Sequence, residues 1–179
     1  MCARSHLWGF AFKALALEAI AKEQALSGRL DLAFESYVLI EPTEKERSQA
    51  LLAIVEAQAK AGQWAEARQS ATKIRVDESL ARALATLAAA QAKGGHRKPA
   101  AALWADALRA IQRIGAESDR AWALRDLGVE LARSGFGRQA VETADSILTN
   151  RNHALPQIAP ALADAEGRDD WKSLPIPCA

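Results

Sequence analysis

The sequence has few cysteines, few aromatic residues and almost no net charge. Only two of its 179 residues are cysteines, Cys2 and Cys178, one near each end. Two isolated cysteines form neither a metal-binding pattern nor a disulfide framework. The 23 basic and 22 acidic residues leave a net charge of +1. This balance gives no reason to expect binding to nucleic acid or to a membrane surface.

Long apolar runs are also missing. No window of 18 residues is free of charged residues, so no transmembrane helix is predicted. Lys13 and Glu18 interrupt the apolar stretch near the N-terminus, which therefore lacks the continuous apolar core of a signal peptide. A cytoplasmic protein is the expectation, and the abrupt ends also fit a segment of a longer polypeptide.

The apolar residues that are present favour helices. Half of the sequence is hydrophobic, but aromatic residues make up only 6% of it, and alanine and leucine dominate the rest. Alanine and leucine are strong helix formers, whereas strands favour β-branched and aromatic residues. The composition therefore predicts an all-α protein.

Four glycines mark an internal repeat. Each glycine is preceded three residues earlier, and followed five residues later, by alanine; aliphatic residues stand eight and eleven residues before it. Each glycine is expected to end a first helix in the left-handed conformation, and each following alanine to let a second helix pack closely against the first. The anchor glycines are Gly28, Gly62, Gly95 and Gly135.

Helix-start signals separate the expected helix pairs. Thr43 followed by Glu46 fits a capping box. The 40-residue interval between the last two anchor glycines exceeds the 33-residue interval before it, which predicts a longer second helix at about residues 97–115. The expected N-cap residues of the second, third and fourth pairs are Thr43, Asp77, and either Ser118 or Asp119.

This pattern resembles the tetratricopeptide repeat (TPR) family, whose unit is a helix–turn–helix of roughly 34 residues. The resemblance covers about residues 8–174. All four copies have leucine where the family has its early tryptophan, and only Pro42 lies near the family's proline between repeats. Another α-solenoid, such as a HEAT-like one, is the structural alternative. The turn glycine with its alanine is carried by Gly28/Ala33, Gly62/Ala67, Gly95/Ala100 and Gly135/Ala140.

The resemblance implies a right-handed α-solenoid of stacked antiparallel helix pairs with a concave groove for a peptide or protein partner. We expect one domain spanning residues 1–179. An unfinished last repeat would leave an apolar end, so end-to-end association of copies is also expected. The repeats are predicted at about residues 8–42, 43–76, 77–116 and 117–150, with a partial fifth at 151–174.

Cations recur two residues before the turn glycines. We call Lys60, Lys93 and Arg133 the basic row; the first repeat has Leu26 there. The resemblance implies that this face lines the groove, where the row would meet an acidic peptide or a C-terminal carboxylate. The alternative is a solvated face, because cations near a helix C-terminus also suit the helix dipole. Three further candidate binding residues on the same first helices are Arg82, Arg125 and Trp122, the last either a groove anchor or a packing residue.

No catalytic, cofactor or metal site is predicted. The histidines His6, His96 and His153 are expected to be solvated, and no glycine-rich phosphate loop follows a strand. The inner helix stripe is mostly alanine and glutamine, which argues against an enzyme. The sequence therefore predicts a non-catalytic scaffold or adaptor that binds a protein or peptide. The alternative is a sensor or regulatory segment of a larger signalling or transcription-regulating protein.

Overall fold

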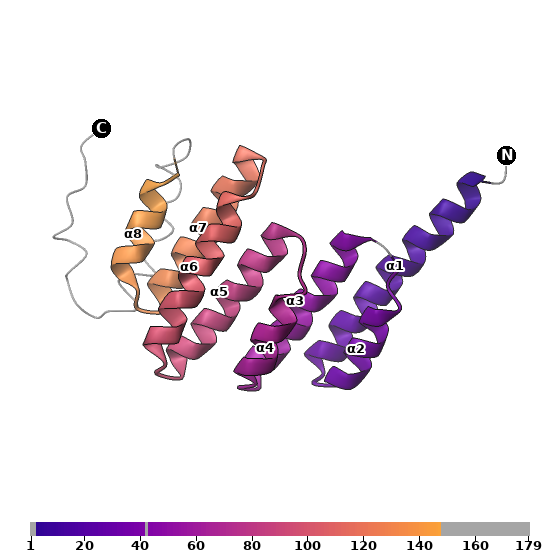
Figure 1. Cartoon of the computed structure of the whole chain (residues 1–179), viewed down its shortest axis with the longest axis horizontal. Helices are drawn as coiled ribbons and strands as arrows, with labels where there is room; N and C mark the ends of the chain where they lie inside the picture. Colours follow the sequence, from indigo (N-terminus) through magenta and orange to yellow (C-terminus); the bar gives the residue numbers. More distant parts are fainter. Residues whose placement is uncertain (1–2, 42, 148–179) are drawn as a thin grey trace. The chain divides into compact units, whose positions relative to one another are not determined.

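The computed structural model describes the backbone of residues 3–41 and 43–147, and side chains from residue 11 onward within these ranges (Figure 1). In this part of the chain all regular secondary structure is helical, as predicted, and none of the helices is both long and apolar enough to cross a membrane. The predicted partial fifth repeat, His153 and both cysteines lie outside the described residues.

Eight helices are described, and they belong to two compact units. The first unit ends at Ala110 and the second begins at Ile111. The helices are α1 (Ala3–Leu26), α2 (Leu30–Val38), α3 (Glu44–Lys60), α4 (Trp64–Ala71), α5 (Asp77–Lys93), α6 (Arg97–Gln112), α7 (Glu117–Arg133) and α8 (Gly137–Asp145).

Long and short helices alternate along the chain. The first helices α3, α5 and α7 have 17 residues each, whereas α2 and α8 have 9 and α4 has 8. The second helix α6 is the exception, with 16 residues. This confirms the prediction of a longer second helix at about residues 97–115, although α6 ends at Gln112.

The four anchor glycines form the same turn. Their φ angles are 77°, 74°, 82° and 75°, all in the left-handed region. At Gly62, for example, the Gly62 amide donates to the Ala59 carbonyl (3.2 Å) and the Gln63 amide donates to the Gln58 carbonyl (2.9 Å). This pair of bonds is a Schellman motif, which satisfies carbonyls left without partners at the helix end. The glycine spacing therefore identified all four turns.

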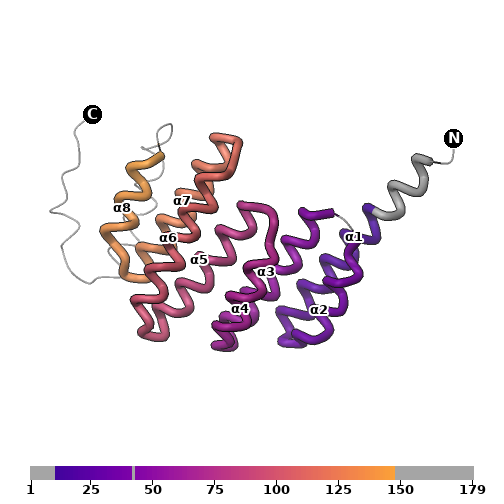
Figure 2. The backbone as a smooth tube through the Cα atoms, in the orientation of Figure 1, coloured from indigo at the N-terminus to yellow at the C-terminus, as the bar shows by residue number. Residues whose placement is uncertain are grey.

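In the first unit the first helices of successive pairs lie side by side. Helix α3 contacts α1 on one side and α5 on the other, and α2 and α4 pack beside them (Figures 1 and 2). Alanine permits these close approaches, because the alanine five residues after each turn glycine is fully buried. The largest fully buried side chains between the helices are aliphatic: Ile40, Leu51, Ile54, Leu87 and Leu103.

Polar contacts join consecutive pairs within the first unit. The Ser48 hydroxyl on α3 accepts hydrogen bonds from the backbone amides of Arg75 (3.3 Å) and Val76 (3.2 Å), in the segment between α4 and α5. The Gln49 side-chain amide on α3 donates to the Ser79 hydroxyl on α5 (3.2 Å). Ser48 and Ser79 are both buried, so these bonds satisfy polar groups that burial would otherwise leave without partners.

In the second unit α7 packs against α8. The Arg120 guanidinium on α7 donates to the Ile114 carbonyl (3.0 Å). Arg120 stands as many residues before the turn glycine Gly135 as Arg47 in α3 stands before Gly62. The core of this helix pair combines leucine with alanine, and its buried members include Leu127, Leu131, Ala140, Ala144 and Ile147.

The predicted helix caps are mostly wrong. Thr43 does precede α3 as its N-cap, but its hydroxyl donates to the Glu41 carbonyl (3.2 Å) and makes no cap bond, so the capping box with Glu46 does not form. Val76 and Ala116 occupy the other two N-cap positions, and Asp77 and Asp119 lie inside the first turns. There the carboxylates suit the positive end of the helix dipole without capping the helix.

Candidate functional site

Three of the six candidate binding residues belong to each unit. Lys60, Lys93 and Arg82 lie on α3 and α5 in the first unit, whereas Arg133, Arg125 and Trp122 all lie on α7 in the second. The two groups therefore form two candidate patches, one in each unit.

Lys60 and Lys93 occupy equivalent ends of neighbouring helices. Lys60 is the last residue of α3 and Lys93 is the last residue of α5, and these two helices are in contact. Both side chains are exposed. Within residues 11–41 and 43–147, neither lysine forms an ion pair. Two like charges on adjacent helices, neither of them in an ion pair, create a local positive field that an anion would relieve.

Arg82 extends the positive patch along α5. It lies eleven residues before Lys93, which brings the two side chains to nearly the same side of the helix, about 16 Å apart along its axis. Arg82 is exposed. On α1 the position equivalent to Lys60 is Leu26, which is 62% exposed. The equivalent position therefore holds an apolar residue on α1 (Leu26) and a cation on both α3 (Lys60) and α5 (Lys93).

Arg133 differs from the lysines of the basic row because it has an ion-pair partner. Its Nη1 lies 3.0 Å from Glu130 Oε1, one turn earlier on α7. Both side chains are substantially exposed, and such pairs contribute little to stability. Glu130 nevertheless reduces the positive field at this position, so Arg133 is a weaker anion site than Lys60 or Lys93.

Trp122 and Arg125 form a stacked pair on α7. The Trp122 side chain is 59% exposed, and the Arg125 guanidinium carbon lies 4.4 Å from the centre of its ring. Arg125 Nε also donates to Asp126 Oδ1 (2.9 Å). The cation–π contact and the ion pair together hold the guanidinium in place, so an exposed aromatic surface stands next to an oriented cation.

Sequence reasoning missed a contact of His96. The His96 ring was expected to be solvated, and the residue is exposed, but its ring lies 4.6 Å from that of Trp64 in an edge-on arrangement. A Cβ atom at Gly94 would lie 3.0 Å from the Trp64 ring. Gly94 therefore makes room for Trp64, a role that the turn pattern alone did not reveal.

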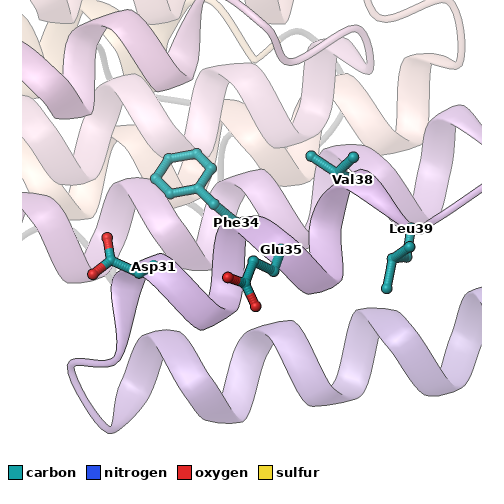
Figure 3. A pocket seen from close by; sticks show the side chains of 5 residues that line it. All are labelled: Asp31, Phe34, Glu35, Val38 and Leu39. Carbon is teal, nitrogen blue, oxygen red and sulfur yellow. The ribbon is translucent and has the colours of Figure 1, made fainter.

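A shallow depression of about 500 Å³ lies along α2. Its five lining side chains come from α2 and the residue after it, with Phe34 and Val38 on one side of the helix and Leu39 on the other (Figure 3). Asp31 and Glu35 supply the only charges in this lining. Among the described residues no group of three or more histidine, cysteine, aspartate or glutamate side chains is placed to hold a metal ion.

Comparisons with known proteins identify no relative. No protein-family model matches the chain, and no curated protein and no solved structure matches it at the required significance.

Proposed function

We propose that this chain is a TPR-like helical-repeat scaffold that binds an acidic segment of another protein and has no catalytic role of its own. Its helix pairs would stack as a right-handed solenoid, with the exposed positions near the ends of the first helices facing the partner. The observation that carries the proposal is the placement of Lys60 and Lys93: both exposed, without an ion pair in the described chain, and at equivalent ends of two helices in contact.

A solvated helix face is the competing explanation, because a lysine at a helix C-terminus interacts favourably with the dipole. Two features favour binding. Arg82 lies far from the C-terminus of α5, so the helix dipole gives no reason for a cation at this position. It is nevertheless on nearly the same side of the helix as Lys93. Leu26 breaks the series with an exposed apolar side chain, which a helix-end preference does not explain.

These residues indicate the chemistry of the partner. Carboxylates would meet Lys60 and Lys93, and an apolar side chain would meet Leu26. In the second unit, Trp122 and Arg125 form a separate candidate patch, with an aromatic anchor next to a cation. A peptide with acidic residues and one large apolar residue fits Lys60, Lys93 and Leu26 best.

Binding can be tested with fluorescently labelled peptides that carry acidic residues and a leucine, by anisotropy at low and high salt. We expect the wild-type chain to bind, and Lys60→Gln/Lys93→Gln to lose most of the affinity and of its salt dependence, because two charge contacts that salt screens are removed. Lys45→Gln/Lys98→Gln is the matched control, since it removes two exposed lysines from helix starts in the same unit. Equal losses in both variants, or no binding by the wild type, would contradict the proposal.

A further inference from the structure

Exposed large apolar side chains are concentrated on the first helix pair. Trp122 is the single exception in the described part of the chain. Terminal repeats of stacked proteins usually present a polar outer face, because nothing covers it. The first pair departs from this rule on both of its helices. Its exposed apolar residues are Phe12, Leu15, Ile20, Leu26, Leu32, Val38 and Leu39.

Part of this surface occupies positions that are buried elsewhere. Ile20 is 46% exposed, although its equivalents Ile54 in α3 and Leu87 in α5 are fully buried. Ala16 is exposed in the same way, whereas Ala50 in α3 and Ala83 in α5 are fully buried at the equivalent position. Helix α1 has a second helix beside it and a following pair, as α3 does. Only a preceding pair is missing among the described residues, so Ala16 and Ile20 mark the surface on which a preceding pair would pack.

Helix α2 continues this surface. Phe34 faces the second pair, because the Lys73 ammonium lies 5.7 Å from its ring. At 100° per residue, Leu32 and Leu39 lie about 160° and 140° around the helix from Phe34 in the same sense, on the side away from the second pair. Figure 3 shows Phe34 and Leu39 on opposite sides of α2. We call the surface formed by Ala16, Ile20, Leu32 and Leu39 the end face.

The end face is also more apolar at its margin than an internal face of the stack. The second pair has Glu66 and Lys73 at the positions of Leu32 and Leu39, and both are exposed. Replacing charges by leucines at solvent-exposed positions favours association, since burial of apolar area is the main driving force.

We infer that the end face binds the same face of a second copy of this chain, with the two α1 helices antiparallel about a two-fold axis. In such an interface residue i meets residue j and residue j meets residue i. Ala16 and Ile20 are equally far along the chain from Glu18. If the two antiparallel α1 helices cross at the level of Glu18, the large Ile20 of one copy packs against the small Ala16 of the other, as a knob against a hole.

The charges bordering the end face agree with this arrangement. Lys13 and Glu23 are also equally far from Glu18; both are exposed, and neither forms an ion pair within the described residues. Antiparallel α1 helices bring Lys13 of one copy to the level of Glu23 of the other, twice by symmetry. A parallel arrangement would instead place like charges at the same level, which is unfavourable. This interface joins the first helix pairs of two copies, whereas the end-to-end association expected from the sequence rested on the apolar end of an unfinished last repeat.

The test is the oligomeric state of the full chain, measured by light scattering and sedimentation over a wide concentration range. We expect a monomer–dimer equilibrium in the wild type and dimerisation at least about tenfold weaker in Ile20→Glu and in Ala16→Glu. Ala16 is exposed and glutamate is a good helix former, so this variant keeps its fold by circular dichroism. Leu26→Glu is the control, because it removes an exposed leucine of α1 outside the end face and should leave the dimer intact.

A charge exchange tests the orientation. Lys13→Glu and Glu23→Lys should each weaken the dimer several-fold at low salt, and the double variant should restore it. A wild type that stays monomeric, open-ended growth of larger species, a dimer insensitive to both end-face variants, or no restoration in the double variant would overturn the inference. The basic row is not part of the end face, so each of these results leaves peptide binding by Lys60 and Lys93 as a separate question.

Discussion

Arg47 on α3 binds Tyr37 on α2 in two ways: its guanidinium carbon lies 5.0 Å from the centre of the tyrosine ring, and its Nη2 donates to the tyrosine hydroxyl (3.1 Å). A third contact, from Nη1, reaches the Ile40 carbonyl (3.3 Å). Arg47 of the second pair thus holds both the buried Tyr37 side chain and the backbone at Ile40, where the first pair ends.

Arg47→Lys should therefore destabilise the first unit by about 1–2 kcal/mol, because an ammonium cannot stack and donate in two directions at once. Urea unfolding followed by circular dichroism measures this free energy. Arg75→Lys is the control, since the Arg75 side chain is exposed. An equal effect of both substitutions would show that the Tyr37 contact contributes nothing specific.

Gly62→Ala should cost about 1–2 kcal/mol in the free energy of unfolding, since the residue has a φ of 74° and an L-residue is strained there. No atom lies within 4 Å of the added Cβ, so the cost would be conformational and not a steric clash. Gly115→Ala, which also meets nothing within 4 Å and has no left-handed φ, should be close to neutral. A neutral Gly62→Ala would contradict the role assigned to the turn glycines.

Gln58→Leu should stabilise the first unit by about 1 kcal/mol. Gln58 is 4% exposed, and its Oε1 has no hydrogen-bond partner among the described residues. A buried polar atom without a partner carries an uncompensated desolvation cost. Helix α7 already has Leu131 at the equivalent position, where it is buried. The melting temperature should rise; a fall would mean that the Gln58 amide makes contacts that leucine cannot replace.

Ala67→Leu should destabilise the chain by about 1–3 kcal/mol, because Ala67 is fully buried and three added carbon atoms must force the helices apart. Its neighbour Ala65 is exposed, so Ala65→Leu adds the same side chain without overpacking and should change the unfolding free energy little. Thermal unfolding of the two variants side by side makes the comparison. Similar melting temperatures would imply that the helix pair can separate without cost.

The caps show where local sequence reasoning failed. Thr43 and Asp77 have the side chains that N-caps prefer, yet Thr43 makes no cap bond and Asp77 falls inside the helix. Consecutive pairs are joined here by short segments whose backbone already has partners, such as Val76, whose amide donates to Ser48. This long-range bond holds the backbone directly before α5, and a local pattern does not contain it.

The sequence by itself determined the helices and their turns. Glycines that adopt a left-handed φ without strain, alanines at fixed offsets and aliphatic residues at helical spacing are local properties, and the structure has a turn at each of Gly28, Gly62, Gly95 and Gly135. Only the tertiary structure decided which side chains stay exposed. Ile20 and Ile54 occupy the same position in the pattern, but one is half exposed and the other buried, because burial depends on which helices lie alongside and not on the residue itself.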